Sequence, residues 1–320
     1  MANIQTLDRL DQKLLAELDA NARAPLSQVA KGIRLGSDLV HYRFERLIER
    51  GVVLRTSAVV DFYRAGKTLY KVYLRLRNQT GQYKAIEKHL NRSVDLHWFA
   101  RTHGKWDLIF SFYAEHSRTA YLQMTSVLEP YAEHILETAV LTVVSRVRFS
   151  GTFGIKRGRA RTTIGESPDS VELDPLEIKL LKSLEQDARI PTTHLAEHLG
   201  TTQAIIDYRR KRLEQLGLIT GYRLHIDSPR LGLSLYKLCL RLRSYKQTVL
   251  NAIEKFCERS PFGVCVIHQL GEWLIELEVE VSDHSELHQI VDDLREELGE
   301  DLLSIDPLLV KDCYYLNRTE

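Results

Sequence analysis

The sequence predicts an α+β protein built as a tandem duplication, in which a winged helix-turn-helix followed by a βαββαβ domain occurs twice. Three observations carry this prediction. The stretch from Leu7 to Arg77 aligns without a gap on Leu173 to Arg243, and roughly a third of the aligned positions are identical. Each copy begins with apolar residues at helical spacing. Each copy then continues with alternating strand-like and helical segments.

Each copy opens with three short helices. Leucines recur on one face of the first helix, and Pro25 or Pro191 starts the second helix after a polar turn. Gly51 and Gly217 end the third helix, where a left-handed residue is needed. The expected ranges in the two copies are 8–18 and 174–184, 27–31 and 193–199, and 35–53 and 201–219.

The third helix of each copy has an apolar face and an opposite face of basic and aromatic side chains. Such a helix, preceded by another short helix, is suited to recognition in the DNA major groove. The alternative is a solvated basic surface without a ligand. The expected DNA-binding residues are His41, Tyr42, Arg43, Arg46, Tyr208, Arg209, Arg210 and Arg212.

Strand-like segments follow the helices of each copy. The runs 52–61 and 218–227 are expected to supply a small wing and an exit strand. The remainder is predicted to form a ferredoxin-like βαββαβ domain, an antiparallel sheet with two helices on one face, whose bare face would pair with another copy. The expected elements are 69–77, 83–90, 96–102, 106–113, 117–131 and 139–149 in the first copy, and 235–243, 247–259, 263–268, 272–281, 286–298 and 308–315 in the second.

The segment between the copies contains glycines, a proline and no hydrophobic period, which predicts a linker. Its cations could follow a phosphate backbone or enter a minor groove, or they could serve solubility alone. These cations are Lys156, Arg157, Arg159 and Arg161. The predicted domains are 1–62 and 172–228 (winged helix-turn-helix), 63–150 and 229–320 (βαββαβ), and 151–171 (linker).

Composition describes an ordinary globular chain. The 320 residues carry a net charge of +1, so nucleic-acid binding would depend on local patches. No C-x-x-C spacing and no apolar signal segment or membrane span occur, so we expect a reducing cytoplasm, no disulfide, no metal, no cofactor and no membrane partner. His97, His103 and His268 suggest metal ligands only weakly, because no third ligand accompanies the hairpin pair.

A longer motif joins the first and third helices of each copy. The pattern L-D-x-x-D-x-x-L-L-x-x-L, then A-R, then R-x-x-R-L-x-x-x-G, is present within 7–53. It returns within 173–219, where Glu177 replaces the second aspartate. These residues resemble the Lrp/AsnC family, the feast/famine regulators of transcription, and the βαββαβ segment resembles that family's effector-binding domain.

The resemblance implies a regulator that binds double-stranded DNA through its helix-turn-helix pair. It also implies a small-molecule effector, commonly an amino acid, at interfaces between the effector domains. Family members usually carry one unit and dimerise through their sheets. We therefore expect this chain to contain both subunits of such a dimer, and to form further homo-oligomers.

The turn between the second and third strands of the βαββαβ domain matches the family's glycine, aromatic and aspartate turn. The resemblance implies effector binding by Gly104, Trp106 and Asp107, and by Gly271 in the second copy, where Leu274 replaces the aspartate. The alternative is a tight turn with an exposed aspartate and a core tryptophan. Core packing is expected for Trp98, Trp106, Trp273, Tyr113, Cys239, Cys257, Cys265 and Cys313.

Two other classes of protein compete with the regulator. Fused siroheme decarboxylases resemble this double architecture, but the strand 96–106, LHWFARTHGKW, lacks the H-x-x-N-x-W-F run associated with them. Because no nucleophile triad, P-loop or G-x-G-x-x-G is present either, we expect a protein that is not an enzyme. A ligand-binding module whose helices only dimerise is the third possibility.

Overall fold

The computed structural model describes residues 4–77, 82–93, 96–155, 158–167 and 169–314. Its residues form two compact units, each of which combines segments of both copies. The helix-turn-helix unit holds residues within 1–65, 148–164 and 168–233. The barrel unit holds residues within 66–147, 165–167 and 234–320. The five predicted domains therefore follow the order of the chain. In the structure, the two helix-turn-helix segments form one unit and the two βαββαβ segments form the other.

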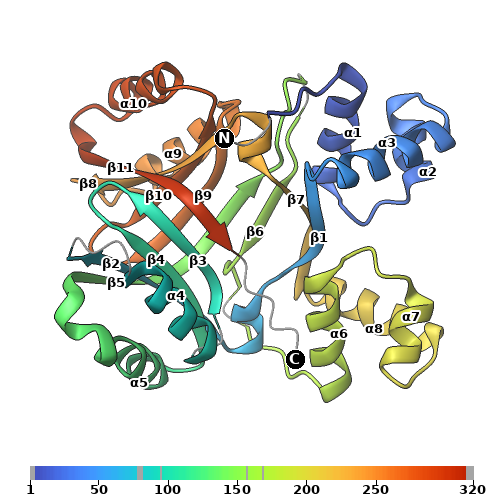
Figure 1. Ribbon diagram of the computed structural model, residues 1–320, viewed down its shortest axis with the longest axis horizontal. Helices are drawn as coiled ribbons and strands as arrows, with labels where there is room; N and C mark the ends of the chain where they lie inside the picture. The colour runs from blue at the N-terminus through green and yellow to red at the C-terminus, as the bar shows by residue number, and fades with distance from the viewer. Residues whose placement is uncertain (1–3, 78–81, 94–95, 156–157, 168, 315–320) are drawn as a thin grey trace. The chain divides into compact units, whose positions relative to one another are not determined.

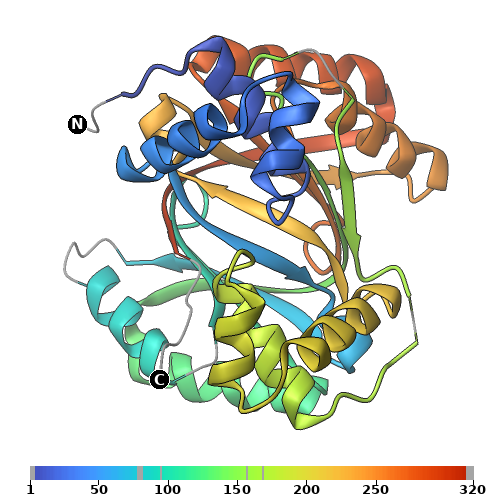
Figure 2. The same cartoon turned by 90° about the vertical axis from the view of Figure 1, so that its right-hand side faces the viewer.

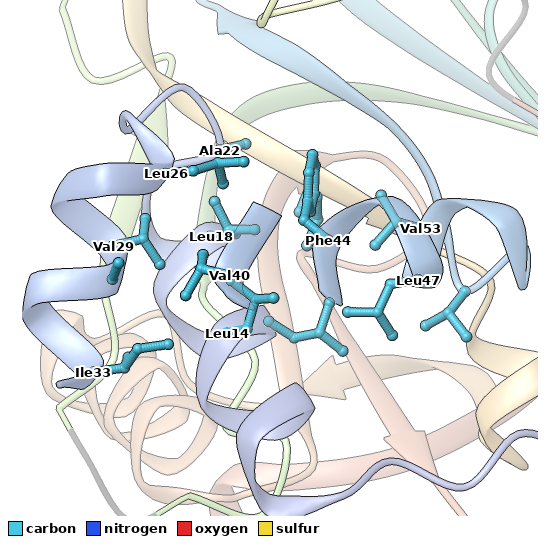
Figure 3. Packing of buried hydrophobic residues seen from close by; sticks show 14 residues of the cluster. Leu14, Leu18, Ala22, Leu26, Val29, Ile33, Val40, Phe44, Leu47 and Val53 are labelled. Carbon is cyan, nitrogen blue, oxygen red and sulfur yellow. The ribbon is translucent and has the colours of Figure 1, made fainter. Parts of the chain in front are cut away.

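The helix-turn-helix unit contains two clusters of three helices, as the periodicity predicts. The leucines of the first helix and the apolar face of the third form a buried core, which includes Leu14, Leu18, Val40 and Phe44 (Figure 3). The helices are α1 (Arg9–Ala20), α2 (Leu26–Ile33) and α3 (Ser37–Glu49) in the first copy, and α6 (Pro175–Gln186), α7 (Thr192–His198) and α8 (Gln203–Gln215) in the second.

The strand after each cluster pairs with its counterpart in the other copy. β1 (Val53–Val60) and β7 (Ile219–Ile226) form an antiparallel two-stranded sheet, so each expected run makes one strand in place of a separate wing and exit strand. Figure 2 shows this ribbon running between the two helical clusters. Short 3₁₀ turns, η1 (Phe62–Ala65) and η3 (Ser228–Leu231), end the strands.

Each strand of the ribbon also completes the core of the other copy's helices. Leu224 of β7 is buried with the first cluster, and Ala58 and Val60 of β1 are buried with the second. Neither cluster of helices therefore buries its apolar face with its own strand alone. This exchange makes the two helix-turn-helix segments one structural unit.

The described part of the barrel unit contains eight antiparallel strands in a closed ring. Their order is β2-β4-β3-β11-β8-β10-β9-β5, and β5 pairs back with β2. A further short strand, β6 (Arg161–Ile164), belongs to the helix-turn-helix unit. Closure leaves no free edge among these eight strands. They are β2 (Thr68–Leu76), β3 (Leu96–His103), β4 (Leu108–Ala114) and β5 (Ile135–Phe149) in the first copy, and β8 (Ser234–Leu242), β9 (Gly263–Leu270), β10 (Ile275–Val281) and β11 (Leu302–Tyr314) in the second.

Helices cover the outer surface of the barrel. α4 (Gln82–Ser93) and α5 (Ser117–Leu128) belong to the first copy, and α9 (Gln247–Arg259) and α10 (His284–Leu298) to the second (Figure 1). Short 3₁₀ turns follow α5 at Glu129–His134 and α10 at Gly299–Asp301. The predicted βαββαβ order is confirmed in both copies, and the inner sheet faces pack on each other as expected.

The segment expected to be a linker is partly docked on the first helical cluster. Phe153 packs against the core of that cluster. The buried carboxylate of Asp19 accepts hydrogen bonds from the backbone N–H of Gly151 at 2.7 Å and from Arg148 at 2.9 Å. A spacer without contacts is therefore too simple a description. Lys156 and Arg157 lie outside the described residues.

Candidate functional site

Arg43 of α3 is fastened to the start of α1. Its Nη1 donates to Asp8 Oδ2 and to Asp11 Oδ1, both at 2.7 Å, and its side chain is only 16% exposed. These hydrogen bonds raise the pKa of Arg43. Asp8 also caps α1 by accepting from the N–H groups of Leu10 and Asp11, and the latter bond lowers the pKa of Asp8. Arg43 therefore orients α3 against α1 and does not lie free on the surface.

The second copy uses the same clamp with one carboxylate changed. Arg209 of α8 pairs with Asp174 and, at 3.1 Å, with Glu177, and Arg212 also donates to Glu177. Glu177 is 1% exposed and forms a capping box with Asp174. The L-D-x-x-D/E and R-x-x-R parts of the motif are therefore partners in space.

Arg210 is held within its own copy. It donates to Glu214 at 2.7 Å, and its side chain is 17% exposed. Glu214 also accepts from Tyr222, and burial together with this hydrogen bond raises the pKa of Tyr222 to about 12. Of the eight expected DNA-binding residues, four arginines are thus paired with neighbouring carboxylates: Arg43, Arg209, Arg210 and Arg212.

The exposed faces of α3 and α8 carry a different set of side chains. Tyr42 and Tyr208, at equivalent positions, are 62% and 66% exposed. Arg46 is exposed and makes no ion pair within the part of the chain that the structure describes, whereas its counterpart Arg212 is paired. His41 is exposed, with its ring Nδ1 2.9 Å from the backbone oxygen of Ser37. Leu39 and Ile205, which helical spacing assigned to the apolar face, are also exposed. Lys211, on the basic face of α8, is exposed as well.

Two arginines missed by the sequence analysis lock the copies together. Arg189 donates to the backbone oxygens of Ala22 at 2.8 Å and Ala24 at 2.9 Å, while Arg23 donates to the backbone oxygen of Ala188. Burial lowers the pKa of both arginines. The Ala-Arg pair occurs in both copies of the sequence. The sequence alone does not show that each arginine bonds to the backbone of the other copy.

The two glycine turns of the expected effector site lie in one barrel. Gly104 has φ +144°, and a Cβ there would lie 2.9 Å from the backbone oxygen of Pro307 on β11. Gly271 has φ +147°, and a Cβ there would lie 3.1 Å from the backbone oxygen of Val140 on β5. Each turn therefore packs on the last strand of the other copy, and glycine is required for that approach.

The other expected effector residues are engaged within the fold. Asp107 accepts from the N–H of Leu76 at 2.7 Å and from the hydroxyl of Tyr83 at 3.3 Å. Trp106 is 1% exposed and lies in the barrel core, so it does not form an open pocket wall in this structure. Trp98 and Trp273 are buried in the same core, whereas Tyr113 is half-buried with its ring 5.1 Å from that of His97.

A network of buried charges crosses the barrel interior. Glu276 accepts from Lys71 and from Lys237, each at 2.7 Å, and Tyr73 donates to it as well. Burial alone would raise the pKa of Glu276, but the charges of the two lysines outweigh it and hold the pKa to about 2. Lys237 also pairs with Glu278. Both carboxylates come from the second copy, whereas each copy supplies one lysine.

Some buried polar atoms near the second turn have no hydrogen-bond partner among the described residues. They are both side-chain atoms of Gln269 and the indole nitrogen of Trp273. His268 pairs with Glu254 at 2.9 Å. Within the described ranges, no three His, Cys, Asp or Glu side chains cluster as a metal site would require.

Cys239, Cys257 and Cys265 are buried and are not joined in disulfide bonds, and the side chain of Cys313 lies outside the described set. Among the described helices, none has the length and apolar character needed to cross a membrane.

Two exposed recognition helices joined by a shared ribbon define a protein of the tandem helix-turn-helix class. Residues 173–214 match the AsnC-type helix-turn-helix domain, and residues 7–53 match a winged helix-turn-helix DNA-binding domain. The chain is 30% identical over 125 residues to the regulatory protein AsnC of Haemophilus influenzae, which covers 37% of this chain and 79% of that protein. The chain belongs to the Lrp/AsnC family of transcriptional regulators, as the motif predicted.

Other similarities cover different shares of the chain. The leucine-responsive regulatory protein of Rhizobium meliloti is 37% identical over 70 residues, which are 22% of this chain and 45% of that protein. The siroheme decarboxylase NirDL has the same tandem fold, with a TM-score of 0.62 over 94% of this chain and 90% of that chain, at 10% identity. The expectation that the protein is not an enzyme was therefore wrong to exclude that class, because NirDL is an enzyme with this fold.

Proposed function

We propose that the chain is a sequence-specific DNA-binding regulator in which both recognition helices bind one duplex. The observation that carries this proposal is the shared β1–β7 ribbon, together with the reciprocal hydrogen bonds of Arg23 and Arg189. They hold the two helix-turn-helix segments in one unit, so the second helix binds at a high effective concentration once the first is bound.

The exposed faces offer chemistry suited to a major groove. Tyr42 and Tyr208 supply hydroxyls and aromatic rings, and Leu39 and Ile205 are placed to contact thymine methyl groups. Arg46 supplies a cation that can bind guanine or phosphate. The clamped residues Arg43, Arg209 and Arg212 contribute by fixing the orientation of these helices. Arg210 instead pairs with Glu214 along α8 itself.

The test is retardation of a DNA fragment from upstream of the protein's own gene, with unrelated DNA as competitor. The proposal expects a complex that survives excess competitor. A complex lost equally to any competitor would contradict sequence-specific binding.

We further infer that an amino-acid-like small molecule binds in the barrel unit, and that the chains form larger homo-oligomers. The unpaired amide of Gln269 and the indole N–H of Trp273 support a ligand, because buried polar atoms normally have a partner. Thermal unfolding with each amino acid in turn tests this, and Gln269→Leu should abolish any stabilisation found. Light scattering with and without that amino acid measures the number of chains in the assembly.

A tetrapyrrole-binding enzyme is the second candidate. It is favoured by the shared fold over 94% of this chain with NirDL, a protein whose structure with an iron-uroporphyrin III analogue is known. Titration with iron uroporphyrin should give a shifted Soret band if this candidate holds. An unshifted spectrum at saturating protein would contradict it.

A further inference from the structure

The turn between α2 and α3 contains a conformational outlier. Arg34 has φ 58° and ψ 48°, in the left-handed region that residues with a side chain rarely adopt. Its counterpart in the second copy is Gly200, at φ +64°, where glycine adopts the conformation without strain. The two copies thus make the same turn, and the first places an arginine where the backbone favours glycine.

Near the two turns, equivalent positions of the two copies carry charges of opposite sign. Lys31, in the last turn of α2, is exposed, and its counterpart is the exposed Glu197. Glu45, on the exposed face of α3, has the exposed Lys211 as its counterpart on α8. At these positions the first copy places cations at the turn, and the second places a cation on the recognition helix.

No carboxylate within the described residues explains Arg34. Its side chain is exposed and forms no ion pair there, in contrast to Arg43, which binds two aspartates. A strained residue whose exposed cation has no ion pair among the described residues points to a role in binding. Phosphate is the matching partner, because Arg34 and Lys31 are adjacent cations beside a recognition helix.

We propose that Arg34, together with Lys31, binds the DNA phosphate backbone, so that the first helix-turn-helix holds the duplex through its turn. The second helix-turn-helix holds it through Lys211. This inference rests on the proposed DNA-binding function. A phosphate contact adds affinity on every sequence and fixes the register of the helix, but it does not choose bases.

The test compares full-length variants on labelled duplexes of about 40 base pairs and several mixed sequences, long enough for two half-sites. Arg34→Gly reproduces the second copy's turn. Its affinity should fall about fivefold on every duplex, and its plot of log affinity against log salt should become shallower by about one. Its unfolding temperature should stay equal or rise by about 2 °C, because the strained residue is gone.

Two further variants isolate the charge from the backbone. Arg34→Asn keeps a side chain that tolerates the left-handed region and should lose the same affinity as Arg34→Gly. Gly200→Arg adds the cation to the second copy, where a Cβ has no heavy atom within 4 Å. This variant should bind with a steeper salt dependence than the natural chain.

The possible failures are distinguishable. If the natural chain binds DNA and both Arg34 variants match its affinity and salt dependence, the role of Arg34 is refuted while the proposed function stands. If the natural chain binds none of these duplexes at low salt, the proposed function fails and the inference fails with it. A loss of affinity on only one sequence would indicate base reading and would overturn the phosphate role.

Discussion

At the scale of single residues, two arginines on the polar face of α3 have different roles. Arg43 and Arg46 lie one helical turn apart on α3, yet Arg43 holds Asp8 and Asp11 while Arg46 is exposed. Helical spacing places both on the polar side of the helix. Only the position of α1 decides which of the two is enclosed.

This difference gives a paired prediction. Arg43→Ala should lower the free energy of unfolding by about 2 kcal/mol, because Asp11, whose side chain is 7% exposed, loses its closer partner and is left with Arg50 at 3.7 Å. Arg46→Ala should change stability by less than about 0.5 kcal/mol and weaken DNA binding. Urea denaturation and DNA titration of both variants measure this. Equal stability of the two variants would contradict the clamp.

At the scale of elements, the glycine turns are packing devices between the copies. The turn at Gly104 lies against β11, and the turn at Gly271 lies against β5. Lys105 pairs with Glu272 at 2.9 Å, which joins the two turns. The resemblance singled out these turns as effector-binding, whereas the contact that requires each glycine comes from the other copy.

Gly104→Ala should therefore destabilise the barrel by about 3 kcal/mol, through both the strained φ and the contact with Pro307. Gly66→Ala is the matched control, since Gly66 has φ +71° and no heavy atom within 4 Å of a Cβ. It should cost about 1 kcal/mol, from the backbone alone. Thermal unfolding compares them, and similar losses would show that the close packing does not matter.

The sequence predicted most of the helices and strands. It did not predict which of these elements pack against each other. Periodicity predicted the helices, the βαββαβ order and the bare inner sheet face. It could not predict that β1 pairs with β7, that Leu224 completes the first core, or that Arg23 and Arg189 cross the copies. A pattern indicates which face is buried, but it does not indicate what covers that face.

At the scale of the whole molecule, the duplicated halves have become complementary. In the first copy, Ser111 pairs in register with Lys71, whereas Glu278 pairs with Lys237 in the second. Two copies of the first half would bury two lysines without a carboxylate. The balanced network of Lys71, Lys237, Glu276 and Glu278 exists only when one half of each kind forms the barrel.

Glu276→Gln should destabilise the chain by about 3 to 5 kcal/mol at pH 7, because it leaves an excess buried charge. The pKa of Glu276 is lowered to about 2 in the fold, so its stabilisation is complete above the unfolded value of about 4.3 and is lost as pH falls through 2. The difference in the free energy of unfolding between the natural chain and the variant should narrow over that acid range.

The matched control keeps the interior neutral. Lys71→Met combined with Glu278→Gln leaves the pair of Lys237 and Glu276, and it should lose less stability at pH 7 than Glu276→Gln alone. Unfolding by urea at a series of pH values measures both. A gap that stays constant with pH would remove the role given to Glu276.

The proposed regulator requires both recognition helices to act on one duplex. Hydroxyl-radical footprinting of the full chain on an upstream fragment tests this most directly. We predict two protected segments on one face of the DNA, centred a whole number of helical turns of about 10 base pairs apart. A single protected segment, or no protection at a concentration that saturates a retardation assay, would contradict the account.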